Sequence, residues 1–276
     1  MVNSLRFRAT VLSLIILVVT LGIWEISVLK PESSTPKTEY ELLLGGAEQE
    51  SRVPPPSDVA KLAFKEISNP IYDNGPNDKG IAIQLGYSLY RVLAGYLLAA
   101  LIALPLGFVI GMSPLMYKAI NPYIQLLRPI SPLAWMPLAL FVIKDSELSA
   151  IFVIFICSIW PMLVNTAFGV SNVRGDWLKV ASTHELSSLR TAFTVILPAA
   201  APTILTGMRI SIGIAWLVIV AAEMLVGGTG IGYYVWNEWN NLDLTSVIFS
   251  IVMIGVVGML LDMLLALAIK KVEYEE

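Results

Sequence analysis

Residue types that commonly perform catalysis are few in this sequence, and none of them falls in a catalytic spacing. The single histidine, His184, has no HExxH partner, and no GxSxG nucleophile turn is present. The single cysteine, Cys157, lies inside the apolar run IFVIFICSIW, which excludes an intrachain disulfide and a thiolate metal cluster. No GxxxxGK[ST] phosphate loop occurs, so ATP is not expected to bind to this chain. We therefore expect no catalytic residue, no metal site and no cofactor here.

Ionisable residues inside the apolar runs are the next candidates, because a charge within a bilayer is costly and usually marks a site. Counting along alternating helices, at about 1.5 Å per residue, places Arg91 and Glu223 in the outer half of the membrane. The same count places Arg209 and Asp262 in the inner half. We predict two structural ion pairs, Arg91 with Glu223 and Arg209 with Asp262, since an unpaired charge in lipid is strongly unfavourable. The same runs also contain Glu25 and Arg128.

Neutral polar residues in these runs are candidates for the lining of a solute passage. They offer hydrogen bonds without trapping a charged solute, and weak contacts at several points suit transport better than a charged cage. Each can instead form a hydrogen bond between helices, and the sequence leaves both alternatives open. The pathway candidates are the neutral residues Gln125, Ser131, Trp135, Asn165 and Ser211, together with the charged residue Arg91.

The composition is that of a membrane protein. Of the 276 residues, 56% are hydrophobic and 14% are charged, and the mean hydropathy is +0.73, whereas soluble domains carry roughly a quarter charged residues. A net charge of −3 with scattered basic residues does not indicate nucleic-acid binding. Apolar runs long enough to cross a bilayer predict an all-α membrane protein with about six transmembrane helices, at residues 10–29, 82–112, 118–143, 147–169, 199–226 and 244–270.

Lysine and arginine in the short flanks of these runs fall on one side of the membrane if six helices alternate. The positive-inside rule makes that side cytoplasmic, so both termini are expected there. The chain then divides into an N-terminal anchor helix (1–30), an extracytoplasmic segment (31–81), a membrane core (82–270) and a cytoplasmic tail (271–276). Within the extracytoplasmic segment, Ser57 of VPPPSDVAKLAFKEI can cap a short helix lying on the membrane surface. That segment is either a spacer or a docking surface.

Proline punctuates the third apolar run, NPYIQLLRPISPLAWMPLALFVI, at four positions. Each proline removes a backbone donor, and kinked backbone within a membrane is tolerated where protein or a cavity surrounds it. We expect one kinked helix that faces a partner or a pathway, with simple packing within the bundle as the alternative.

The cytoplasmic segment 171–197 is too polar to be inserted in the membrane. Trp177, Val180 and Ala181 mark one short amphipathic helix, and Leu189, Phe193 and Ile196 mark a second that is expected to end at Pro198. A helix–turn–helix on that face indicates a soluble partner.

The stretch KVASTHELSSLRTAFTVILPAAAPTILTGMR resembles the coupling loop of ABC-importer permeases. Ala181, the Leu197–Pro198 closure and TGMR match the family pattern, whereas Lys179 stands at the usual acid and Glu185 at the usual glycine. Further resemblance to one branch of the family extends over about residues 53–270, in VPPPSDV, SLYRVLAGYLLAALIALPLGFVIG, LLRPISPLAWMPL and AAEMLVGGTGIGYYVWNEWNNLDLTSVIFSIVMIGVVGMLLD. That branch comprises the permeases for nitrate, bicarbonate, taurine and alkanesulfonates, and GGTGIGYYVWNEWNNL looks closest to the cyanobacterial nitrate and bicarbonate members.

This resemblance implies a type I ABC-importer permease fold and a homodimer in the bacterial inner membrane. It implies ATP-binding subunits, holding ATP and Mg, on the cytoplasmic side and a solute-binding protein outside. The expected solute is nitrate, with nitrite as a second solute, bicarbonate, a sulfonate or taurine as alternatives and a passive anion channel as a rival. Contacts with the ATPase are expected from Lys179, Ala181, His184, Glu185, Leu186 and Ser187.

Overall fold

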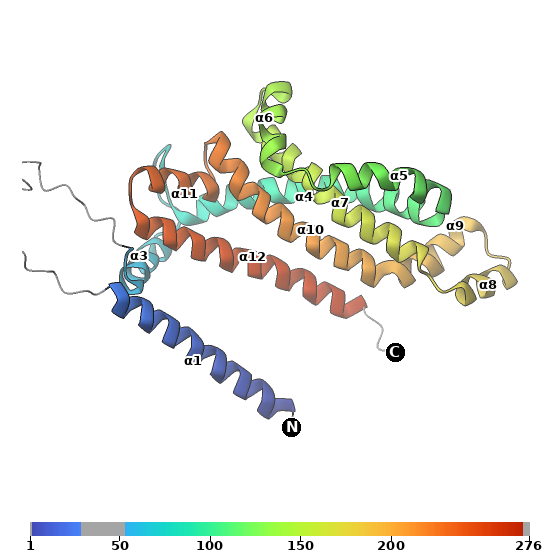
Figure 1. Cartoon of the computed structure of the whole chain (residues 1–276), viewed down its shortest axis with the longest axis horizontal. Helices are drawn as coiled ribbons and strands as arrows, with labels where there is room; N and C mark the ends of the chain where they lie inside the picture. Colours follow the sequence, from blue (N-terminus) through green and yellow to red (C-terminus); the bar gives the residue numbers. More distant parts are fainter. Residues whose placement is uncertain (1, 29–52, 273–276) are drawn as a thin grey trace, which may run out of the picture. The chain divides into compact units, whose positions relative to one another are not determined.

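The computed structural model describes residues 2–28 and 53–272, and almost all of these lie in helices (Figure 1). They form two compact units, one from Met1–Pro70 with Val235–Val252 and the other from Ile71–Tyr234 with Met253–Glu276. The expected boundary at 30–31, the first part of the extracytoplasmic segment and most of the tail 271–276 lie outside the described residues.

The first unit contains the helices α1 (Val2–Val28) and α3 (Pro56–Ser68). No described side chain of α1 is buried, as expected for an apolar helix surrounded by lipid. The carboxylate of Glu25 on α1 accepts hydrogen bonds from the backbone N–H (3.2 Å) and the hydroxyl (2.9 Å) of Ser57. The prediction that Ser57 caps α3 is wrong, because Pro55 is the N-cap residue and Ser57 lies in the first turn. The carboxylate of Glu25, on α1, instead accepts the free backbone N–H at the beginning of α3.

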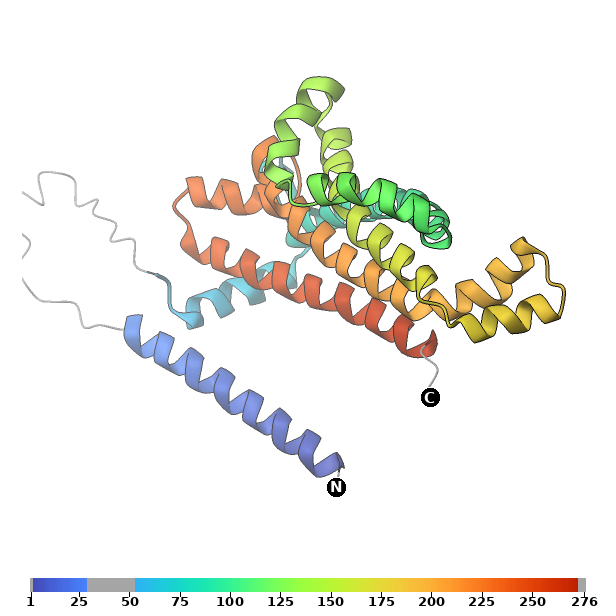
Figure 2. The same ribbon diagram turned by 45° about the vertical axis from the view of Figure 1, so that its right-hand side comes forward.

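Three long helices form the core of the second unit: α4 (Ile81–Met112), α7 (Ser146–Ser171) and α10 (Leu197–Val226). They run side by side (Figures 1 and 2), and glycines on α4 allow the close approach to α7. A methyl group at Gly111 would lie 2.6 Å from the carbonyl oxygen of Ala167, and one at Gly107 would lie 2.8 Å from the Cβ atom of Thr166. Small residues spaced by four are a common basis of helix packing in bilayers, where no hydrophobic force drives association.

The third apolar run forms two helices, α5 (Pro114–Leu127) and α6 (Pro132–Ile143), which are bent by 91°. The expectation of one kinked helix is therefore wrong. Proline restricts the residue before it to extended backbone, and Ser131, which precedes Pro132, has φ −61° and ψ 137°. Pro129 lies in the break as well, and the chain turns there.

The segment 171–197, which the sequence predicts to be cytoplasmic, contains α8 (Gly175–Thr183), α9 (Ser188–Thr191) and the π-helical turn η1 (Ala192–Ile196). The prediction that the second short helix ends at Pro198 is wrong, since Ser188–Val226 forms one 39-residue helical span through η1 and α10. A π-turn changes the hydrogen-bond register, which accommodates a proline without ending the helix.

The remaining elements are a small antiparallel hairpin, β1 (Asp73–Gly75) with β2 (Asp78–Lys79), and the helices α11 (Ile231–Asn240) and α12 (Leu244–Val272). Among the residues that the structure describes, five helices are long and apolar enough to cross a membrane, and the bent pair α5–α6 would make a sixth span. The predicted fold class, an all-α membrane protein with about six spans, is confirmed.

Candidate functional site

The turn after α8 is the best-defined feature of the cytoplasmic segment. The backbone N–H of Leu186 donates to the carbonyl of Ala181 (3.2 Å), and that of Glu185 donates to Ser182 (3.0 Å). This pair of bonds is a Schellman helix end, which requires left-handed backbone at the residue after the C-cap. That residue is Glu185, with φ 52°, so this chain places a glutamate where glycine is favoured.

The predicted ATPase-contact residues divide into exposed and buried positions. Lys179, His184, Glu185 and Ser187 are exposed and Leu186 is half-buried. Ala181 is 3% exposed, so it packs within its own chain and offers no surface to a partner.

Large apolar side chains on the same segment are exposed, although the sequence analysis used them only to mark helix faces. The exposed fraction is 58% for Val180, 75% for Leu189 and 68% for Phe193. Their apolar type on a polar segment was the signal that marks them as candidates for contact with a partner.

The opposite end of α10 carries a buried polar cluster. Glu223 is 2% exposed, and its carboxylate lies 2.8 Å from Nη1 of Arg91 on α4. The same guanidinium nitrogen donates to the carbonyl of Thr229 (2.7 Å), and the hydroxyl of Ser88 donates to the Glu223 carboxylate (2.8 Å). Arg91 therefore has strong partners within the chain.

This cluster also binds the start of α11. Arg91 and Glu223 were predicted from the sequence, whereas the neutral members Gln84 and Ser88 were not. Polar residues at 84, 88 and 91 recur at helical spacing in an apolar run, which was the signal available for them. The bonds to α11 run from the N–H groups of Gly230, Ile231 and Gly232 to Gln84, Ser88 and Glu223, respectively.

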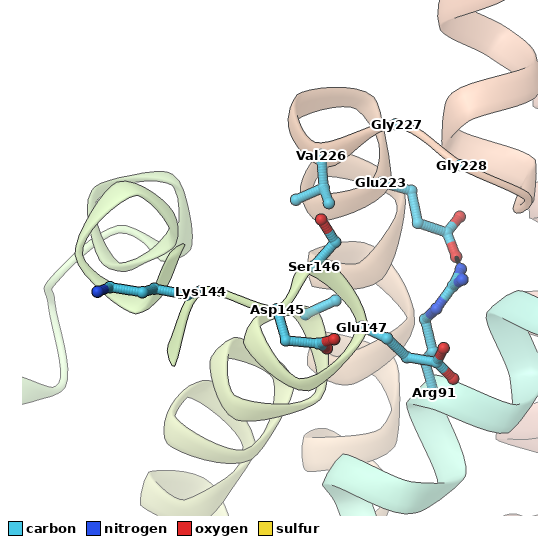
Figure 3. Close-up of a pocket in the computed structure, with 10 residues that line it drawn as sticks. Arg91, Lys144, Asp145, Ser146, Glu147, Glu223, Val226, Gly227 and Gly228 are labelled. Atoms are coloured by element: carbon cyan, nitrogen blue, oxygen red, sulfur yellow. Dashed lines mark hydrogen bonds and ion pairs between the residues drawn. The ribbon is translucent and has the colours of Figure 1, made fainter. Parts of the chain in front are cut away.

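A cavity of about 400 Å³ lies beside the Arg91–Glu223 pair. Figure 3 shows Arg91 and Glu223 beside each other, Glu147 from the first turn of α7 extending toward Arg91, and Asp145 between Glu147 and Lys144, which points away. Carboxylates outnumber cations around this cavity, so its charge does not favour a bound anion.

The second predicted ion pair lies on α10 and α12. Nε and Nη2 of Arg209 each lie 2.5 Å from a carboxylate oxygen of Asp262, a bidentate geometry. The side chains are 41% and 51% exposed. A half-exposed ion pair on membrane-spanning helices faces protein or water in preference to lipid, so this surface needs a polar or protein cover.

The neutral pathway candidates also divide. Ser211 is fully buried, and its hydroxyl donates to the carbonyl of Ser158 on α7 (2.8 Å), so it is a contact between helices. The amide of Asn165 donates to Pro161 in its own helix (2.8 Å). Gln125 and Ser131, beside the α5–α6 break, are exposed, and Trp135 is half-buried. Within residues 2–28 and 53–272, no group of three or more His, Cys, Asp or Glu side chains could hold a metal ion.

Comparison with known proteins gives consistent matches. The family described as "Binding-protein-dependent transport system inner membrane component" matches residues 88–274. The nitrate import permease protein NrtB of Synechocystis sp. is 44% identical over 227 residues, 82% of each chain. The NrtB protein of Synechococcus elongatus is 42% identical over 79% of each chain. The bicarbonate transport system permease protein CmpB of Synechocystis sp. is 41% identical over 76% of each chain. The resemblance identified from the sequence is thereby confirmed.

Solved structures agree at the level of the fold. A chain of the MetNI methionine ABC transporter, in an inward-facing conformation, matches with a TM-score of 0.61 and 14% identity, covering 69% of this chain and 95% of the other. A chain of an amino acid ABC transporter with histidines matches with a TM-score of 0.57, also at 14% identity, covering 78% and 97%. At such identities the likeness shows the fold, which is that of ABC-importer permeases.

Proposed function

The chain belongs to the family of binding-protein-dependent transport system inner membrane components, and on that premise we propose that it is the permease subunit of an ATP-driven nitrate importer. The observation that carries the proposal is the 44% identity with a nitrate import permease over 82% of both chains. Nitrite, a smaller anion of the same charge, is a second expected solute. The chain itself is a transport component rather than an enzyme.

The proposed partners follow from the family and from the exposed surfaces. ATP-binding subunits, which hold the ATP and Mg, bind the cytoplasmic segment through Lys179, His184, Glu185 and Ser187, with the exposed Val180, Leu189 and Phe193 as apolar contacts. A solute-binding protein delivers the anion at the opposite face of the membrane. Both termini are cytoplasmic in this arrangement, as the positive-inside rule requires.

A second copy of the permease completes the pathway in this proposal. The half-exposed pair Arg209–Asp262 needs a cover other than lipid, and α5 and α6 expose large apolar side chains such as Leu115 (77%) and Phe141 (80%). A homodimer supplies protein against such surfaces and encloses a passage between two copies. Native mass measurement should find two permease chains per complex; a single chain enclosing its own pore would contradict the homodimer.

Bicarbonate is the second candidate solute, because its permease is 41% identical to this chain. Both anions carry one charge and have nearly the same planar shape. Since Arg91 and Arg209 are paired, the exposed Arg128 and neutral donors such as Gln125 and Ser131 are left to guide the anion with weak contacts. We therefore assign selection to the solute-binding protein.

The test is uptake of labelled nitrate, nitrite and bicarbonate into vesicles that contain this permease and its ATP-binding subunits. Each solute-binding protein is supplied in turn, and vanadate is added in a parallel sample. Uptake of nitrate that needs its binding protein and stops with vanadate supports the proposal. Uptake that continues with vanadate indicates a channel, and a preference that follows the permease instead of the binding protein contradicts upstream selection.

A further inference from the structure

We infer that Glu223, together with Gln84 and Ser88, ties the first turn of α11 to α4 and α10, so that α11 follows the movement of the cytoplasmic segment. These three are positioning residues for the opening and closing of the pathway. The inference rests on the proposed function, because a transporter that alternates its access needs such a movement.

The tie consists of three consecutive hydrogen bonds. The first N–H groups of a helix have no partner within that helix and must be satisfied from elsewhere. Here all three acceptors are side chains of other helices, at short distances, and one is a carboxylate that suits the positive end of the helix dipole. The bonds join Gly230 to Gln84 (2.7 Å), Ile231 to Ser88 (2.9 Å) and Gly232 to Glu223 (3.0 Å).

Two glycines make this approach possible. A Cβ atom at Gly230 would overlap the carboxylate of Glu223, and one at Gly232 would overlap the carbonyl oxygen of Val220. The backbone of α11 thus begins closer to Glu223 and Val220 than a residue with a side chain would permit. Arg91 holds the other side of the cluster through Glu223 and the carbonyl of Thr229. A buried polar network with satisfied members is rigid and favours one arrangement.

The connection to the cytoplasmic segment is the continuous helical span Ser188–Val226. Its 39 residues correspond to roughly 58 Å at the rise of an α-helix. One end, α9, belongs to the cytoplasmic segment, and Glu223 lies near the other end, where Figure 1 shows the chain passing from α10 into α11. The helix continues through the π-helical turn η1 into α10, so we expect a displacement of α9 by the ATPase to reach α11 through the tie.

The test measures whether α11 responds to nucleotide. Spin labels are attached at Asn240→Cys, at the end of α11, and Leu148→Cys, in the exposed first turn of α7, in a Cys157→Ala background. The distance between labels is recorded in the full complex in lipid, without nucleotide and after trapping with ATP and vanadate. The variant is Glu223→Ala. The matched control is Tyr96→Phe, which removes another α4–α10 hydrogen bond, to the carbonyl of Met208, without touching α11.

We expect a nucleotide-dependent shift in the unmodified complex and in Tyr96→Phe, and the loss of most of that shift in Glu223→Ala. Glu223→Gln, which keeps one acceptor oxygen, should recover part of the shift. If Glu223→Ala does not accumulate, Gln84→Ala with Ser88→Ala removes two acceptors without leaving a buried unpaired charge, and the same loss is expected. An undiminished shift in these variants, or no shift in a complex that hydrolyses ATP, overturns the inference.

Uptake of nitrate is measured in the same vesicles. ATP hydrolysis without nitrate uptake would count against nitrate as the solute. The distances measured at α11 would still test whether Gln84, Ser88 and Glu223 couple α11 to α4 and α10.

Discussion

Replacing Glu185 by glycine should stabilise the turn that ends α8. The residue has φ 52°, and left-handed backbone costs a residue with a side chain about 1–2 kcal/mol. Glycine avoids that cost but loses more backbone entropy on folding, by about 0.5–1 kcal/mol. The difference leaves a net stabilisation of about 0.5–1 kcal/mol, which makes opening of the turn about two to five times rarer.

Hydrogen exchange followed by mass spectrometry measures this opening. The informative amides are those of Glu185 and Leu186, which donate to Ser182 (3.0 Å) and Ala181 (3.2 Å). Position 185 itself is substituted, so the comparison rests on Leu186 and the neighbouring amides of α8. Glu185→Ala is the matched control, because it removes the carboxylate and keeps the left-handed strain. Exchange that slows equally in Glu185→Ala, or does not slow in Glu185→Gly, would refute the reasoning.

Three other predictions concern charge and packing. Glu185→Arg should uncouple ATP hydrolysis from uptake in a permease that still folds; unchanged uptake and ATPase binding would remove the turn from the mechanism. Asp262→Asn should lower the melting temperature by leaving Arg209 unpaired, and exchanging the two charges should restore part of the loss. Gly111→Ala should destabilise the α4–α7 contact by about 1–3 kcal/mol, whereas Gly213→Ala, with open space at its Cβ position, should not; equal thermal stability of the two would contradict the packing argument.

The spans and the intramembrane ion pairs could be predicted because each depends on a strong local signal. A long apolar run predicts a helix regardless of its neighbours, and a charge within it must find an opposite charge at a similar depth. Arg91 and Glu223 illustrate this, since few charged residues share that half of the membrane.

The missed features depend on geometry between helices. The acceptors Gln84 and Ser88 gain their role from the backbone of α11, which hydropathy does not place. Similarly, the hydroxyl of Ser211 could line a pathway or bond to a neighbouring helix. Its hydrogen bond to the carbonyl of Ser158 on α7 distinguishes the two roles, and the sequence does not show that contact. The capping of α3 by Glu25 was missed because local rules consider residues next to the helix end, whereas this carboxylate is 32 residues away.

The right-angled break between α5 and α6 has a further consequence for which substitutions the chain can accept. A backbone N–H without a partner inside a bilayer costs several kcal/mol, so an irregular turn there is favoured when it contains few donors. Pro129 and Pro132 have no N–H, and those of Arg128 and Ile130 donate to the carbonyls of Ile124 (2.9 Å) and Leu127 (3.3 Å). Alanine at position 129 would be ranked as an improvement by helix propensity alone. In this turn alanine would add a backbone N–H that needs its own acceptor. Proline, which has no N–H to donate, is therefore the preferred residue at position 129.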